Sequence, residues 1–74
     1  MPGEKVLNSV RVKRTKLGIT QEDLAGLVGV TRQTIIAMEQ EKYSPSLELA
    51  FRIARVFNLP LEEVFTYDPK DDPI

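Results

Sequence analysis

The chain has 74 residues, no cysteine and no histidine, and its formal net charge is −1. This length holds a single domain, which we expect over residues 1–74 with a core at 6–66, and the missing residue types exclude disulfides and argue against a zinc site. No apolar run approaches the roughly 18 residues of a membrane span, and no secretion signal follows the N-terminus, so we expect a cytoplasmic protein.

Charge is unevenly distributed along the chain. Residues 1–16 contain five Lys or Arg residues and one acidic residue, whereas residues 44–74 contain six acidic and three basic residues. A chain of this kind can present a basic face to a polyanion and an acidic face to solvent. On charge alone, ordinary surface charge of a small domain is the simpler interpretation.

Capping residues and apolar spacing predict five short helical segments. The first covers residues 9–17, where Asn8 or Ser9 caps the start and Val10 and Leu17 share one side. Other sides of this segment carry basic side chains, including Lys13, which are expected to face solvent or to neutralise a polyanion.

The second and third segments are separated by a tight turn. Thr20 opens the second helix and forms a capping box with Asp23, while Gly29 closes it. Thr31 caps a third helix over about residues 32–39.

The fourth segment is the most hydrophobic, and either Ser44 or Ser46 begins it. Its apolar residues recur at helical spacing, which predicts that it is the spine of the core: Leu47, Ala50, Phe51, Ala54 and Phe57. Pro60 then opens a last short helix at residues 61–65.

The predicted fold class is therefore all-α, with five helices and a helix-turn-helix formed by the second and third. The polar residues 68–74 are expected to form a flexible tail. The only strand that the sequence allows is a weak one at Val6 and Leu7.

Enzyme signatures are missing from the sequence. It contains no glycine-rich phosphate loop, no nucleophile elbow and no histidine for acid–base chemistry. Glu62 and Glu63 are adjacent, so they do not face each other on a helix and make a poor catalytic pair. We expect no enzymatic activity, no cofactor, no metal and no small-molecule ligand.

The informative stretch is residues 20–40, TQEDLAGLVGVTRQTIIAMEQ. Two helices of about eight and nine residues meet at a tight turn, and their apolar positions fall where crossing helices would pack. This spacing is typical of a helix-turn-helix, although it also fits any small helical hairpin.

The third helix makes the prediction more specific. If Ile35 and Met38 turn inward, the outward face carries Arg32, Gln33, Ile36, Ala37 and Gln40, with no acidic residue. Arg can bond guanine in two places, Gln can bond adenine in two places, and apolar groups can touch the thymine methyl. Ile36 is expected to meet thymine methyls or, alternatively, to pack against the first helix or lie exposed as a single surface apolar residue.

These stretches, together with KRTKLG upstream and KYSPSLELAFRIARVFNLPLEEVF downstream, resemble the xenobiotic-response-element family of helix-turn-helix regulators. The phage lambda repressor and Cro proteins are relatives of that family. The resemblance covers residues 6–66 in order and with the family's spacing. It implies a five-helix domain that binds double-stranded DNA, usually as a homodimer on a palindromic operator, and has no catalytic activity.

The resemblance also implies roles for individual residues. Base reading falls to Arg32, Gln33 and Thr34, with Ala37 at a further contact position. DNA-backbone contacts are expected from Gln21, Thr31, Gln40, Lys42 and Lys16. Gln21 also resembles a residue that braces the third helix, which is the recognition helix. The alternative to a phosphate contact from Gln21 is simple first-turn capping. Arg14 and Glu39 match an ion pair that ties the first helix to the third.

Glu41 departs from the family pattern. Many relatives have Gly or Asn there, which indicates a left-handed backbone, and Glu in that conformation costs on the order of 1 kcal/mol. The substitution also places a negative charge close to the expected phosphates.

The end of the chain predicts an interface between two copies. A core of this size cannot cover every apolar group of the last segment, so we expect a dimer contact through Leu61, Val64, Phe65 and Tyr67. The expected function is sequence-specific repression. The alternative is a protein-interaction module, such as an antitoxin or adaptor that uses the same fold.

Overall fold

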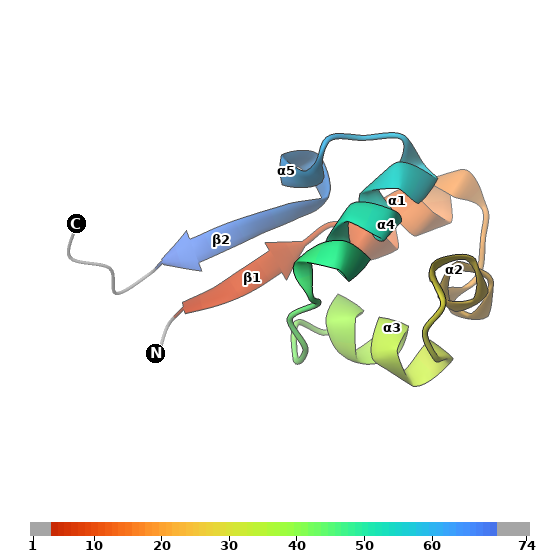
Figure 1. Cartoon of the computed structure of the whole chain (residues 1–74), viewed down its shortest axis with the longest axis horizontal. Coiled ribbons are helices and arrows are strands. Elements are labelled where there is room, and N and C mark those ends of the chain that lie inside the picture. The colour runs from red at the N-terminus through yellow and green to blue at the C-terminus, as the bar shows by residue number, and fades with distance from the viewer. Residues whose placement is uncertain (1–3, 70–74) are drawn as a thin grey trace.

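The computed structural model describes residues 4–69. The elements follow the order β1 (Glu4–Asn8), α1 (Val10–Leu17), α2 (Gln21–Val28), α3 (Arg32–Glu39), α4 (Leu47–Phe57), α5 (Leu61–Val64) and β2 (Phe65–Pro69). The helices gather at one end and the two strands project from them (Figure 1), so the molecule is elongated, measuring 39 × 23 × 21 Å. The five-helix fold with a helix-turn-helix at α2 and α3 is confirmed.

The predicted helix boundaries rest on caps that the structure contains. Thr20 Oγ1 accepts a hydrogen bond from the Asp23 backbone N–H at 3.0 Å, and the Asp23 carboxylate accepts one from the Thr20 N–H at 2.9 Å. This is the expected capping box. Gly29 ends α2 with a φ of 80°, a left-handed conformation that glycine adopts without strain. Ser46, rather than Ser44, caps α4.

The core lies where the inner faces of α1 to α5 meet. Its buried apolar side chains are Val10, Leu24, Ala25, Val28, Ile35, Met38, Leu49, Ala50, Ile53, Ala54, Val64 and Phe65. Every helix contributes at least one of these residues, so the five helices fold as one unit. Leu17 was expected beside Val10, but it lies exposed at the end of α1, next to the turn at Gly18.

Helix α4 buries only part of the face that was predicted: Ala50 and Ala54 are buried, but Leu47 and Phe51 are not. Leu49 and Ile53 are buried, whereas Leu47 and Phe51 are 66% and 48% exposed. Each pair is spaced four residues apart and forms its own row on the helix. Both rows are apolar, so spacing alone could not rank them. The predicted core positions of Leu47 and Phe51 were therefore wrong.

The strands form an antiparallel hairpin that the sequence revealed only in part. The weak strand at Val6 and Leu7 is present and belongs to β1, where Val6 pairs with Tyr67 of β2. The expected flexible tail, 68–74, is corrected at its first two residues, which continue β2; residues 70–74 lie outside the described part of the chain. A two-stranded sheet needs further packing for stability, and the inner end of the hairpin obtains it by packing Val6 and Phe65 against the helices.

Val64 and Phe65 belong to the core of the protomer. Val64 is 1% exposed and Phe65 is also buried, and both belong to the core cluster, beside which α5 packs against α4. Val64 therefore offers a second copy almost no surface, whereas the ring of Phe65 lines a surface groove. Their expected place in a dimer interface stays a prediction. Leu61 and Tyr67, the other two residues of that set, remain accessible.

Candidate nucleic-acid interface

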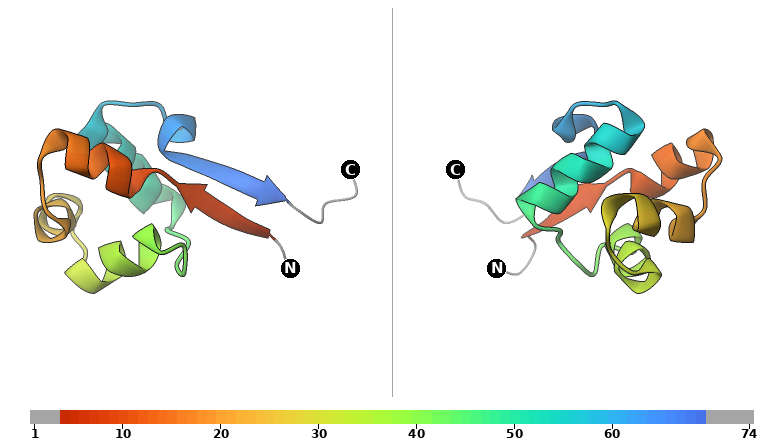
Figure 2. Two further views of the ribbon diagram at one scale, coloured as in Figure 1. Left: turned by 180° about the vertical axis from the view of Figure 1, so that it is seen from behind. Right: turned by 45° about the vertical axis from the view of Figure 1, so that its right-hand side comes forward.

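Helix α3 has a buried inner face and an uncovered outer face. Ile35 and Met38 point into the core and are fully buried, whereas Arg32 and Gln33 are exposed. Two opposite views place α3 at the edge of the helical bundle (Figures 1 and 2), and no element of the described chain covers its outer side. The side expected to meet DNA is therefore open.

The first turn of α3 is held in shape by its own threonines. Thr31 Oγ1 accepts from the Thr34 backbone N–H at 3.3 Å and lies 3.2 Å from Thr34 Oγ1. Both hydroxyls thus take part in the cap, while Arg32 and Gln33 between them project freely. Ile36 is half-buried, so part of its side chain packs against the protein and part remains on the outer face.

A polar cluster ties the end of α3 to α1 and α2. Arg14 donates to both carboxylate oxygens of Glu39, from Nε at 2.8 Å and from the second guanidinium nitrogen at 3.3 Å. Gln21 Nε2 donates to the same carboxylate at 3.1 Å. Arg14 also donates to the Ile19 carbonyl at 3.0 Å. Both carboxylate oxygens of Glu39 therefore accept hydrogen bonds. Through its bond to Glu39, the Gln21 amide nitrogen holds the end of α3 against α2.

The start of α2 and the start of α3 border a common hollow. It has a volume of about 550 Å³, and its lining includes Arg14, Thr20, Gln21 and Arg32. This is the side on which Gln21 and Arg32 are brought together. Lys16 is not part of it.

Lys16 faces another part of the surface. It lines a separate hollow of about 250 Å³ with Lys13, Leu17, Phe57 and Leu59, between α1 and the end of α4. This second hollow includes none of the other residues expected to contact the DNA backbone, and a backbone contact from Lys16 stays a prediction.

The loop after α3 has the left-handed residue that the sequence predicted. Glu41 has a φ of 61°. Its backbone N–H donates to the Met38 carbonyl at 2.9 Å, and the Lys42 N–H donates to the Ala37 carbonyl at 2.9 Å. This pair of bonds is a Schellman motif, in which Glu41 occupies the position usually taken by glycine. The motif fixes Gln40 and Lys42, both exposed, beside the end of α3.

The capping box at the start of α2 also changes the pKa of a carboxyl group. The backbone N–H of Thr20, and next its hydroxyl, stabilise the Asp23 carboxylate and lower the pKa of that group. The described residues contain no group of three or more acidic, histidine or cysteine side chains placed to bind a metal. None of the helices in residues 4–69 has the length and apolar character needed to cross a membrane.

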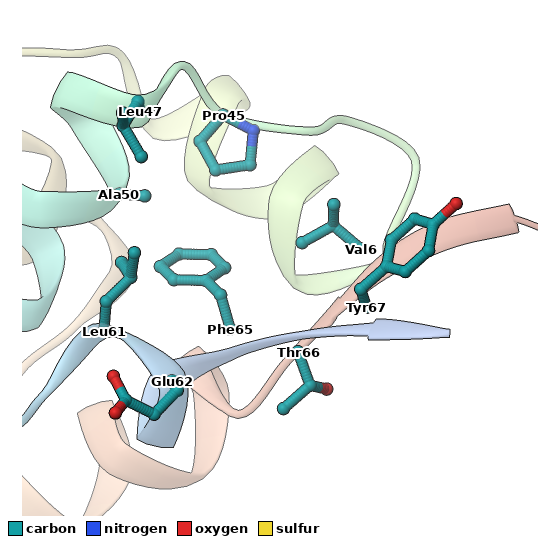
Figure 3. A pocket seen from close by; sticks show the side chains of 9 residues that line it. All are labelled: Val6, Pro45, Leu47, Ala50, Leu61, Glu62, Phe65, Thr66 and Tyr67. Carbon is teal, nitrogen blue, oxygen red and sulfur yellow. The ribbon is translucent and has the colours of Figure 1, made fainter. Parts of the chain in front are cut away.

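A second surface feature is an apolar groove between the hairpin and the starts of α4 and α5 (Figure 3). It has a volume of about 420 Å³ and is lined by Val6, Pro45, Leu47, Ala50, Leu61, Glu62, Phe65, Thr66 and Tyr67. Sequence reasoning found Leu61 and Tyr67 but missed Leu47, because that residue was assigned to the core. Glu62 is the single charged residue of the lining.

The comparisons with known proteins place these features in a family. The family model described as helix-turn-helix matches residues 10–64, which include α1 to α5. The chain belongs to the helix-turn-helix family of transcriptional regulators, of the xenobiotic-response-element type. Strands β1 and β2 lie outside the matched residues.

Relatives of this helix-turn-helix regulator occur in archaea. A helix-turn-helix-type transcriptional regulator of Archaeoglobus fulgidus is 52% identical over 62 residues, which cover 84% of this chain and 89% of the relative. One from Methanothermobacter thermautotrophicus is 57% identical over 60 residues, covering 80% and 87% respectively. The P22 c2 repressor, solved in complex with a synthetic operator, superposes with a TM-score of 0.69 at 26% identity and covers 72% of this chain and 80% of the repressor.

Proposed function

We propose that this regulator represses transcription by occupying a palindromic operator as a homodimer, with the outer face of α3 in the major groove. The observation that carries the proposal is the two-sided character of α3. Ile35 and Met38 anchor one side in the core, while Arg32 and Gln33 project from its first turn on the uncovered side.

The chemistry of that face suits base edges. The Arg32 guanidinium matches the two acceptors of guanine, and the Gln33 amide matches the donor and acceptor of adenine. Thr34 adds a hydroxyl, while Ile36 and Ala37 offer apolar contact with thymine methyls. Specificity is expected from this set, because phosphate contacts carry no sequence information by themselves.

Affinity is expected from groups on either side of α3. Gln21 and Thr31 lie at the starts of α2 and α3, and Gln40 and Lys42 lie in the loop after α3. These positions can meet phosphates of the DNA backbone on both sides of the groove that α3 enters. The P22 c2 repressor, which shares the fold, was solved on an operator, and this supports the assignment.

The apolar groove supports the homodimer. Leu47 and Tyr67 are 66% and 55% exposed at its rim, and exposed apolar side chains grouped in this way are typical of protein interfaces. A two-fold contact brings the same patch of both copies together. Because Glu62 is the single charge in the lining, two copies can meet there without a cluster of like charges.

Selection of bound fragments from random duplex DNA tests the proposal. We expect an inverted repeat whose half-sites lie about one helical turn, roughly 34 Å, apart. A variant with both Arg32→Ala and Gln33→Ala serves as the control and should enrich no site. If the native protein enriches no sequence either, even at low salt, repression by operator binding is excluded and the interaction-module alternative is favoured.

A further inference from the structure

Asn8 joins three elements, of which α3 is distant in sequence from the other two. Its side-chain Nδ2 donates to the Met38 carbonyl oxygen at 2.8 Å, across 30 residues. Its Oδ1 accepts from the Val10 backbone N–H at 3.1 Å. One half-buried amide therefore links the end of β1 to the start of α1 and to the last turn of α3.

The acceptor in α3 is a carbonyl that its own helix leaves unpaired. The last four carbonyls of a helix have no partner within it, and Met38 is among them. Its oxygen accepts from the Glu41 N–H as well as from Asn8, so both of its lone pairs are used. The bond from Asn8 thus shares its acceptor with the Schellman motif that shapes the loop after α3.

Asn8 also lies next to the apolar groove. It is the last residue of β1 and pairs in the sheet with Phe65, whose ring lines that groove. A single residue therefore connects the surface proposed to contact a second copy with the backbone of the recognition helix. The Glu39 cluster, by contrast, ties α3 to α1 and α2.

We propose that Asn8 is a positioning residue for DNA reading, which holds the recognition helix at a fixed place relative to the dimer contact. This inference rests on the proposed function. In a two-fold dimer, the separation of the two α3 helices depends on how rigidly each is joined to the interface. The hydrogen bonds of Asn8 provide such a rigid connection. Asn8 therefore determines how strongly the protein prefers one half-site spacing over another.

Two substitutions distinguish the effects of the two hydrogen bonds that the Asn8 side chain makes. Asn8→Asp keeps an oxygen for the Val10 N–H, and an acidic side chain suits the start of α1, but a carboxylate cannot donate to the Met38 carbonyl. Asn8→Ala removes both bonds without adding charge. Ser9→Ala is the matched control, because it removes the neighbouring bond from Ser9 Oγ to the Glu63 carbonyl, 3.1 Å long, which leads to α5 and not to α3.

The readout is binding to the selected operator, to operators with one base pair added or removed between the half-sites, and to random DNA. All measurements are made where circular dichroism shows each variant to be folded. Both Asn8 variants should bind the selected operator about two- to tenfold more weakly and discriminate less between spacings. Binding to random DNA should be unchanged for Asn8→Ala, and Ser9→Ala should behave like the native protein.

The outcomes distinguish this inference from the function on which it rests. If the native protein prefers one spacing and both Asn8 variants prefer it as strongly, the positioning role is overturned while operator binding stands. If only Asn8→Ala loses the preference, the cap on α1 and not the bond to Met38 is responsible, and the inference is also overturned. If the native protein shows no sequence preference, the proposed function fails and the inference fails with it.

Discussion

Arg14 and Glu39 form a forked ion pair in which two guanidinium nitrogens contact both carboxylate oxygens, at 2.8 and 3.3 Å. The two side chains are only 12% and 4% exposed, so they are largely removed from water. An ion pair of this kind adds little net stability over a well-packed apolar pair, but the loss of one partner leaves the other charge buried. The pair therefore fixes the geometry of α3 and makes it sensitive to single substitutions.

We expect Arg14→Met to lower the free energy of unfolding by about 3 kcal/mol, because Glu39 then keeps only the Gln21 amide as a side-chain partner. Adding Glu39→Met should restore at least half of that loss. Urea unfolding of both single variants and the double variant measures this coupling. Strictly additive losses would show that the two side chains do not depend on each other.

Glu41 stores strain in the backbone. At a φ of 61° a residue with a Cβ is disfavoured, whereas glycine is not. Glu41→Gly should therefore be more stable than Glu41→Ala by about 1 kcal/mol. Both variants lose the same side-chain contacts and the same charge, so their difference in thermal or urea unfolding reports the backbone alone. Equal stability would mean that the loop relaxes to another conformation.

The parts of the fold that sequence predicted are those encoded by local chemistry. Thr20 and Asp23 can satisfy each other's backbone N–H groups wherever they occur at this spacing, and Gly29 is suited to a left-handed turn. These signals need no knowledge of the rest of the chain, so the boundaries of α2 followed from a few residues. The same holds for the outward placement of Arg32 and Gln33 once Ile35 and Met38 are assigned to the core.

The features that sequence missed depend on distant contacts. Leu47 and Leu49 are chemically alike and two positions apart, and only the packing of neighbouring elements decides which of them is buried. The β2 strand pairs with residues some 60 positions earlier, and Pro69 weakens its local strand signal. The bond from Asn8 to Met38 carries no sequence signal that we can identify.

The apolar groove is the proposed contact between two copies, so replacing a residue at its rim should weaken self-association. Tyr67→Ser should weaken self-association by about 2 kcal/mol, roughly thirtyfold in the dissociation constant, because an exposed aromatic at the rim is a typical interface anchor. Leu17→Ser is the control, since Leu17 is also exposed but lies outside the groove. Sedimentation equilibrium distinguishes the two variants. If both associate like the native protein, the interface lies elsewhere on the surface.

We expect the salt dependence of DNA binding to change differently when Lys42 and Lys16 are replaced. Lys42 lies in the loop after α3, so Lys42→Ala should weaken binding to all DNA and flatten the slope of log K against log salt by about 0.9. Lys16 lies on a different surface, so Lys16→Ala should leave the slope nearly unchanged. Both variants lose one positive charge, which excludes net charge as the cause. Equal effects on the slope would place both side chains near phosphates.

The central claim is that the outer face of α3 reads base edges, and Gln33→Ala tests it most directly. Binding of the native protein and of this variant is measured on a panel of duplexes in which each base pair of the selected operator is changed in turn. We expect the variant to lose about 1–3 kcal/mol of discrimination at one position of each half-site and to keep it elsewhere. Equal weakening on every duplex of the panel, random DNA included, would contradict the claim.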